Sequence, residues 1–209
     1  MKPIFITGTG TGVGKTLVSA IVAEALQADY WKPVQAGFEK GTDSQWIENM
    51  ISNKMSVVHP EVYKFKMAAS PHIAGPEEHI EIKVNHIINH VPRTKKQLII
   101  EGAGGLLVPL NKKEFVIQLI KKLKARVIIV SKNELGSINH SLLTAAVLKK
   151  ERMNVAGWIF TEEYLHYENE IEQRSGYPAI ASVKHLNIIS KETIKNEARK
   201  MKRNLEKLL

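Results

Sequence analysis

Residues 8–16 read Gly8-Thr9-Gly10-Thr11-Gly12-Val13-Gly14-Lys15-Thr16, directly after the apolar run Ile4-Phe5-Ile6 and at the start of an amphipathic helical pattern. A strand, a glycine-rich loop and a helix in this order are the context of a phosphate-binding P-loop. The glycines let backbone N–H groups turn toward phosphate oxygens, and the helix N-terminus adds its positive dipole end. We expect Lys15 to reach the β- and γ-phosphates and the Thr16 hydroxyl to ligate Mg²⁺. The predicted nucleotide-binding residues of the loop are Gly10, Thr11, Gly12, Val13, Gly14, Lys15 and Thr16.

The predicted nucleotide-binding residues of the loop end at Thr16. The loop also departs from the common P-loop pattern at one position. Position 17 is Leu17, so no second threonine follows Thr16 and none is assigned to the nucleotide. The common pattern places a glycine where this chain has Thr9, and Gly8 stands one residue earlier. A glycine-rich turn that binds no ligand is the alternative interpretation. The preceding strand, the following helix and the Gly14-Lys15-Thr16 sequence all favour phosphate binding.

The composition indicates one ordinary globular domain over residues 1–209. The chain is 44% hydrophobic and 24% charged, which suits a single core at this length. It contains no cysteine, and this excludes disulfide scaffolds, zinc fingers, iron–sulfur proteins and cysteine nucleophiles. No apolar stretch is long enough for a signal peptide or a membrane span, so we expect a cytoplasmic protein with no membrane partner.

Apolar runs of strand length alternate with helical patterns along the whole chain. This alternation predicts an α/β fold in which helices cover both faces of a mostly parallel central sheet, a three-layer, P-loop NTPase-like architecture. We expect strands over 4–6, 30–34, 98–100, 127–130, 155–160 and 179–183, and helices over 15–28, 44–51, 84–91, 114–124, 138–150 and 164–174, with a last one in 191–209.

The net charge of +9 suggests an anionic partner, but its distribution argues against nucleic acid. Segment 191–209 carries seven basic and three acidic residues, so +4 of the charge lies there. Apolar residues recur in that segment at helical spacing, which makes the basic residues the solvated face of a surface helix. The apolar residues of this pattern are Ile194, Ala198, Met201, Leu205 and Leu208.

Two carboxylates and a second lysine are further site candidates. Glu101 closes the apolar run 98–100 and precedes Gly102-Ala103-Gly104-Gly105, where small residues permit close approach of a ligand. Asp43 is either a metal ligand or the N-cap of the helix expected from Ser44. Lys32 precedes Pro33 at the end of an expected strand, where it either neutralises a phosphoryl group or is a solvated lysine. His86 and His90 share a helix face without a third ligand, which argues against zinc.

Five segments of the chain form a recognisable set: 8–16, Lys32-Pro33-Val34-Gln35, Ser70-Pro71-His72, 101–105 and Leu135-Gly136-Ser137-Ile138-Asn139-His140. In order and spacing, over residues 3 to about 160, these segments resemble the dethiobiotin synthetase family. The resemblance implies a homodimeric enzyme of biotin synthesis that uses ATP, Mg²⁺ and CO₂. Such an enzyme closes a cyclic urea on 7,8-diaminononanoate through a carbamate and a carbamic–phosphoric mixed anhydride.

The resemblance also implies roles for individual residues. Lys15 and Lys32 match the pair that stabilises the carbamate and the transferring phosphoryl group. Thr16, Asp43 and Glu101 match the Mg²⁺ ligands. Segment 136–140 matches the piece that crosses the dimer interface and holds the substrate carboxylate, so the site would be shared between subunits. The substrate-binding residues implied are Lys32, Ala36, Gly102, Ala103, Gly104, Gly105, Ser137 and Asn139.

Three positions depart from the family pattern. Ala36 stands where some members have a hydroxyl residue, Thr161 where members usually have an Asn that reads the adenine edge, and Lys184 near a common proline. Thr161 remains a predicted nucleotide-binding residue, and the last two departures predict use of other nucleoside triphosphates as well as ATP.

Two other classes of protein fit parts of the sequence. A partition-type ATPase switch has an early loop lysine in a Lys-Gly-Gly pattern, which Gly8-Thr9-Gly10 lacks. A small-molecule kinase has an Arg-rich lid, whereas 105–150 contains only Arg126. The loop 53–69 has no assigned role, although Val62-Tyr63-Lys64-Phe65 suggests a short strand over the site.

Overall fold

The protein is an α/β molecule built on a seven-stranded sheet, seen here in a computed structural model that describes residues 1–39 and 41–207. The strand order is β4-β2-β6-β1-β7-β8-β9, and every pairing is parallel. This confirms the predicted fold class. The strands are β1 (Ile4–Gly8), β2 (Asp29–Trp31), β4 (Val58–His59), β6 (Leu98–Gly105), β7 (Arg126–Lys132), β8 (Val155–Thr161) and β9 (Ala179–Val183).

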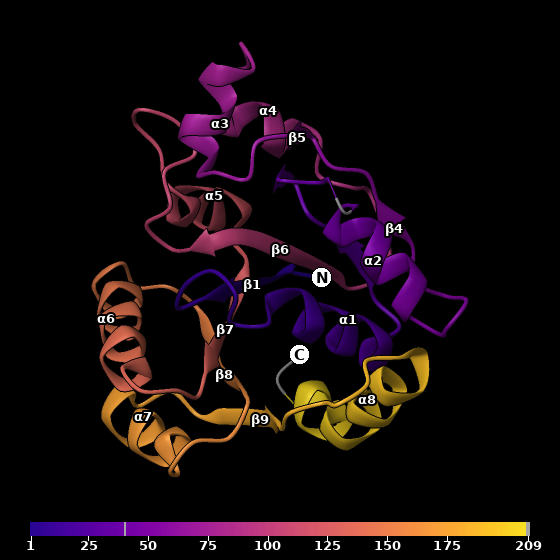
Figure 1. Ribbon diagram of the computed structural model, residues 1–209, viewed down its shortest axis with the longest axis vertical. Helices are drawn as coiled ribbons and strands as arrows, with labels where there is room; N and C mark the ends of the chain where they lie inside the picture. The colour runs from indigo at the N-terminus through magenta and orange to yellow at the C-terminus, as the bar shows by residue number, and fades with distance from the viewer. Residues whose placement is uncertain (40, 208–209) are drawn as a thin grey trace.

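Helices cover both faces of this sheet, as Figure 1 shows. The core therefore consists of two apolar clusters, one on each face of the sheet. Helices α1, α2 and α8 contribute to one cluster, and helices α3 to α7 contribute to the other. The helices are α1 (Lys15–Leu26), α2 (Asp43–Met50), α3 (Pro71–Glu77), α4 (Val84–Asn89), α5 (Val116–Leu123), α6 (Ser137–Lys150), α7 (Tyr167–Ser175) and α8 (Lys191–Glu206).

The central strand β1 supplies side chains to both clusters. Ile4 and Ile6 face the cluster of α1 and α8, and Phe5 between them faces the opposite cluster, because successive strand residues point to opposite faces. Burial on both faces explains why β1 is an unbroken apolar run. Ile6 pairs with Glu101 of β6, which places that carboxylate near the carboxyl edge where the glycine-rich loop begins.

The strand expected over 30–34 is divided in two, which corrects the prediction. β2 ends at Trp31, and after Lys32 and Pro33 the chain starts β3 (Val34–Ala36), which pairs with β5 (Tyr63–Phe65) in a separate two-stranded sheet. Proline has no N–H to donate to a ladder, so the break falls at Pro33. The Pro33 carbonyl instead accepts hydrogen bonds from the backbone N–H groups of Val62 and Tyr63. The strand suggested within 62–65 is thus confirmed as β5.

Other elements differ from the prediction in smaller ways. α3 and the two-residue strand β4 were not predicted, and α7 starts three residues later than expected because Leu165 and His166 adopt left-handed backbone angles. In α8, Ile194, Ala198, Met201 and Leu205 are buried as predicted, while Leu208 lies outside the described residues. Along 1–39 and 41–207, none of the helices combines the length and hydropathy needed to cross a bilayer.

Candidate active site

The glycine-rich loop joins β1 to α1 at the carboxyl edge of the sheet. Gly14 is the N-cap of α1 and has a left-handed φ of 87°, which favours glycine at that position. Lys15, the first residue of α1, folds back so that its Nζ donates to the Gly10 carbonyl at 2.8 Å. The ammonium group therefore lies over the loop whose backbone N–H groups would bind phosphates.

Lys15 has an unusually acidic ammonium group. Burial is the main cause and lowers its pKa to about 8, with a further lowering from Lys32, while Glu101 and Asp43 act in the opposite direction. Because an incoming phosphate favours the charged form, anion binding and protonation of Lys15 are coupled.

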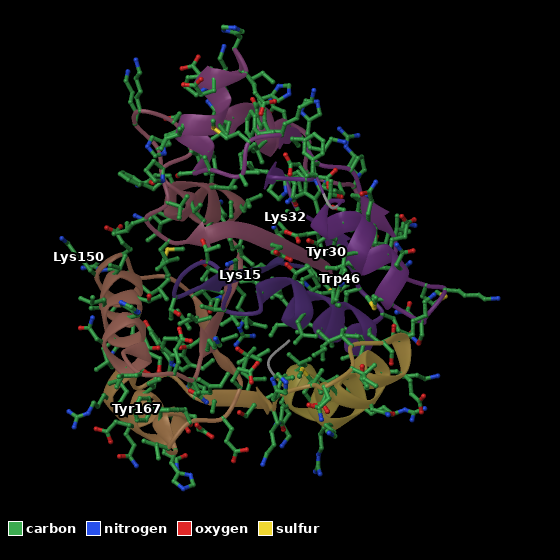
Figure 2. The ribbon with its side chains drawn as sticks, in the orientation of Figure 1. Lys15, Tyr30, Lys32, Trp46, Lys150 and Tyr167 are labelled. Carbon is green, nitrogen blue, oxygen red and sulfur yellow. The ribbon has the colours of Figure 1, made fainter. Side chains whose placement is uncertain are left out.

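Lys32 and Glu101 are the centre of a buried polar cluster. Glu101 Oε1 accepts hydrogen bonds from the Thr16 hydroxyl at 2.9 Å and from Lys32 Nζ at 3.0 Å, and Lys32 also pairs with Asp43. Glu101 Oε2 accepts from the Tyr30 hydroxyl at 3.0 Å. The cluster joins α1, α2, β2 and β6 at one point, and in Figure 2 Lys15, Lys32 and Tyr30 lie near one another in the middle of the molecule.

The charges in this cluster determine the protonation of its members. Burial by itself would lower the pKa of Lys32, but Glu101 and Asp43 outweigh it and raise that pKa above the usual value. Burial, and then the Glu101 charge, raise the pKa of Tyr30 well above its usual range. Lys32 is therefore a permanent cation and Tyr30 a permanent hydrogen-bond donor at neutral pH.

Asp43 does not cap α2, so the N-cap interpretation is wrong. Thr42 is the N-cap, and its hydroxyl accepts from the Gln45 backbone N–H while the Gln45 side chain accepts from the Thr42 N–H. Asp43 is the first helical residue, and its backbone N–H donates to Gln35 Oε1 at 3.2 Å. The Asp43 carboxylate is left to face Lys32.

A cavity of about 700 Å³ opens over this cluster. Its polar end contains Lys15, Thr16, Lys32, Asp43 and Glu101, and its walls are formed by small and apolar side chains. A volume of this size holds a nucleotide or a small organic substrate. The wall residues include Val34, Ala36, Ala69, Pro71, Ala103 and Val108.

Leu17 also lines this cavity, next to Thr16 in the first turn of α1. Its side chain is half-buried and packs partly against the apolar cluster of α1 and α8. Position 17 therefore presents hydrocarbon to the cavity, and the polar contribution of this turn comes from Lys15 and Thr16.

The donor set at the polar end suits a Mg²⁺ ion. Thr16, Asp43 and Glu101 offer one hydroxyl and two carboxylates, all hard oxygen ligands. Within residues 1–39 and 41–207 there is no group of three or more His, Cys, Asp or Glu side chains that could hold a metal by themselves. Magnesium in P-loop sites uses few protein ligands and completes its shell with water and phosphate oxygens, so two carboxylates and a hydroxyl fit it.

The predicted substrate-binding residues between positions 32 and 105 divide into two groups. Lys32, Ala36, Ala103 and Gly104 line the cavity. Gly102 and Gly105 are absent from this lining, and a Cβ on them would come within 2.7 Å of the Phe5 ring and 3.1 Å of the Gly8 carbonyl oxygen, respectively. These two glycines therefore permit β6 to lie against β1 and do not themselves form the cavity surface.

Thr161 and the start of α6 lie outside the cavity lining. Thr161 is buried against the loop, and its hydroxyl donates to the Val13 carbonyl at 3.0 Å. Ser137 is buried at the first turn of α6, whereas Asn139 is exposed. The structure thus does not bring Ser137 or Asn139 to the cavity of their own chain.

A second, open hollow of about 390 Å³ lies between the glycine-rich loop, the segment after β6 and α6. Two leucines on its rim, Leu107 and Leu143, are 58% and 59% exposed. Thr11 and Val108 line both this hollow and the main cavity, so the two are neighbours.

Tyr30 and Gln35 belong to the site but are not among the residues predicted from the sequence. Tyr30 contacts Glu101, and Gln35 accepts from the Asp43 backbone while its Nε2 donates to the Gly37 carbonyl at 2.8 Å. For Tyr30 a signal was present, because it lies two residues before Lys32 and side chains at this spacing in an extended chain point to the same side.

Comparisons with known proteins place the chain among its relatives. A family model described as an AAA domain matches residues 2–193. An ATP-dependent dethiobiotin synthetase from Cytophaga hutchinsonii is 47% identical over 196 residues, covering 93% of this chain and 94% of the relative. One from Christiangramia forsetii is 42% identical over 205 residues, covering 98% of each chain.

Solved structures with the same fold are much more distant in sequence. A chain of the MinC:MinD cell division protein complex from Aquifex aeolicus has a TM-score of 0.61 at 14% identity, covering 96% of this chain and 95% of that one. A ParA family ATPase from Chlorobium tepidum has a TM-score of 0.56 at 13% identity, covering 98% and 91%. At these identities the likeness shows the fold alone.

Proposed function

The chain belongs to the dethiobiotin synthetase family, and from that premise we propose that residues 1–209, as one domain, catalyse ATP-dependent closure of a cyclic urea. The substrates are 7,8-diaminononanoate and CO₂, and the products are dethiobiotin, ADP and phosphate. The observation that supports this best is the position of Lys32, a buried cation between Asp43 and Glu101 at the floor of a P-loop cavity. Such a cation suits a reaction between two anions, a carbamate and a triphosphate.

The reaction needs no nucleophile from the protein. One substrate amine adds to the carbon of CO₂ and loses a proton, which gives a carbamate. A carbamate oxygen then attacks the γ-phosphorus and the bond to ADP breaks, which gives the carbamic–phosphoric mixed anhydride. The second amine attacks the activated carbon, loses its proton and expels phosphate. The absence of cysteine from the chain is compatible with this chemistry.

Lys15 and Lys32 act as the catalytic residues. Lys15, above the loop carbonyl of Gly10, holds the β- and γ-phosphates, and the loop residues 10–16 donate backbone N–H groups. Lys32 offsets negative charge on the carbamate and on the phosphoryl group as they approach. Because both carboxylates near Lys32 raise its pKa, it stays charged throughout the neutral pH range.

Thr16, Asp43 and Glu101 would hold Mg²⁺ with ATP. When bound, the ion neutralises charge on the phosphates and helps to orient them. Thr16 and Glu101 are already joined by a 2.9 Å hydrogen bond, and Lys32 holds Asp43 beside Glu101. These side chains therefore converge without a large movement of the backbone.

The diamine lies along the small-residue wall of the cavity, beside Ala36, Ala103 and Gly104, with Gly102 and Gly105 flanking that wall in β6. The first turn of α6, with Ser137 and Asn139, holds its carboxylate from a second copy of the chain. This arrangement explains why neither residue lines its own cavity. The exposed Leu107 and Leu143 beside the loop offer the second copy an apolar surface to contact, which supports a homodimer with shared sites.

We expect Thr161 to lie near the bound nucleotide and to give little selectivity among the nucleobases. Its hydroxyl is engaged by the Val13 carbonyl, so it offers less to an adenine edge than a free amide. With Lys184 at the position of a common proline, other nucleoside triphosphates are expected to support turnover.

The substrates of this protein are small molecules. We place its activity in the cytoplasm, and we expect it to bind neither a membrane nor a nucleic acid. The basic residues of α8 are all exposed on the face opposite its buried apolar stripe. A partition-type ATPase switch or a small-molecule kinase is not favoured, because relatives at 42–47% identity over nearly the whole chain are dethiobiotin synthetases. The likeness to a ParA family ATPase is confined to the fold.

The experiment that tests this function is ATP hydrolysis with and without 7,8-diaminononanoate and bicarbonate. ADP release is expected to require both, and replacing Lys15 or Glu101 by Ala is expected to abolish it. Hydrolysis at the same rate without the diamine would contradict the proposal.

A further inference from the structure

Tyr30 carries a hydroxyl into an apolar region of the core. Tyr30 is fully buried in the middle of β2, where it pairs with Ile99 of β6 and Val58 of β4. It belongs to the apolar cluster of α1 and α8. Phenylalanine would fill the same volume without a polar atom. Because burying a hydroxyl costs free energy unless it is hydrogen-bonded, its partner at this position is informative.

That partner is the carboxylate of Glu101. The Tyr30 hydroxyl donates to Oε2 at 3.0 Å, while Oε1 accepts from Thr16 and Lys32 on the side of the cavity. Among residues 1–39 and 41–207, Tyr30 is the one side chain that hydrogen-bonds to Oε2. The three donors together fix the plane of the carboxylate, whose terminal torsion is otherwise broad.

We propose that Tyr30 is a positioning residue for the metal site: its hydroxyl holds Glu101 so that Oε1 is presented to Thr16 and to the Mg²⁺ that accompanies the nucleotide. The proposal rests on the proposed function in one respect, the assignment of Glu101 as a Mg²⁺ ligand. Hydrogen-bond partners behind metal ligands commonly change metal affinity by about 10–100-fold. Tyr30 does not touch nucleotide or substrate, because it is absent from the cavity lining.

The test compares ADP binding in EDTA with ADP binding in Mg²⁺ by isothermal titration calorimetry. The ratio of the affinity in Mg²⁺ to the affinity in EDTA measures how strongly the metal ion contributes to ADP binding. In Tyr30→Phe this ratio is expected to fall about tenfold, while ADP affinity in EDTA stays unchanged. An unchanged ratio, or an equal loss of affinity in EDTA, would overturn the proposal.

A matched control separates positioning from a general loss of core hydrogen bonding. Trp158 Nε1 donates to Ser175 Oγ at 2.9 Å in the opposite cluster, and Ser175→Ala removes this buried bond far from Glu101. Ser175→Ala is expected to keep the Mg²⁺ ratio of the native protein. A fall of the same size in Ser175→Ala would show that the effect is not specific to Glu101.

A double variant tests whether Tyr30 acts through Glu101. In a Glu101→Ala background, adding Tyr30→Phe is expected to produce no further fall in the Mg²⁺ ratio, whereas independent effects would add. A further tenfold fall would contradict the proposed route. These titrations contain neither diamine nor bicarbonate, so their outcome is separate from whether the protein makes a cyclic urea.

Discussion

Lys32 donates a hydrogen bond of 3.0 Å to Glu101 Oε1, and both side chains are almost completely removed from water. The two residues lie 69 positions apart, one at the junction of β2 with β3 and the other in β6. Burial disfavours the positive charge of Lys32, and the carboxylates of Glu101 and Asp43 more than offset that effect. Their pairing turns the end of the sheet into a charged floor for the cavity.

Replacing Lys32 by Ala tests the role of this cation. The change leaves Glu101 and Asp43 without their shared partner, so we expect the free energy of unfolding to fall by about 3 kcal/mol and kcat to fall by at least about 100-fold. Circular dichroism melts and steady-state ADP release measure the two effects. Lys195→Ala, which removes an exposed lysine of α8, is the control and should change neither. A Lys32→Ala protein with native kcat would contradict the catalytic role.

The pKa of Lys15 predicts how nucleotide affinity depends on pH. With a pKa of about 8, Lys15 is mostly charged near pH 7 and mostly neutral near pH 9. Because a phosphate binds the charged form, ADP affinity in EDTA should fall by roughly tenfold as the pH rises over that interval. Calorimetric titrations at a series of pH values measure it. Lys15→Arg keeps its charge and should flatten the profile; a native profile that is equally flat would refute the assignment to Lys15.

The exposed leucines beside the glycine-rich loop predict that a charge there separates the subunits. Leu143→Asp should shift the mass measured by light scattering from a dimer to a single 23.5 kDa chain and abolish ring closure. ADP binding should persist, because Leu143 does not line the cavity. Met55→Asp, at another exposed apolar residue, is the control. A fully active Leu143→Asp monomer would show that the site is not shared.

Thr161 predicts a relaxed choice of nucleotide. At equal concentrations, at least one of GTP, CTP and UTP should support measurable ring closure, because the Thr161 hydroxyl is engaged by Val13. Thr161→Asn, which supplies the amide usual in the family, should raise the preference for ATP. Steady-state rates with the four nucleotides check both statements, and turnover by ATP alone would contradict the first.

The features that depend only on residues adjacent in the sequence could be predicted. The loop at 8–16 and the strand that contains Glu101 are contiguous patterns, and the structure confirms the elements on which they lie, although β6 continues past Glu101 to Gly105. The pairing of β3 with β5 in a separate sheet depends on contacts between distant segments. The same holds for Tyr30, whose role depends on a hydrogen bond to a residue 71 positions away. For Asp43 the sequence left two interpretations open, because aspartate is common both as an N-cap and as a metal ligand. The structure decides against the cap, since Thr42 caps α2.

Ring closure by this protein is tested most directly by the mass spectrum of the product formed from 7,8-diaminononanoate, ATP and ¹³C-bicarbonate. We expect a cyclic urea that carries the ¹³C label in its carbonyl carbon, formed in equal amount with ADP and absent when ATP is omitted. ADP release without a labelled urea would contradict this expectation.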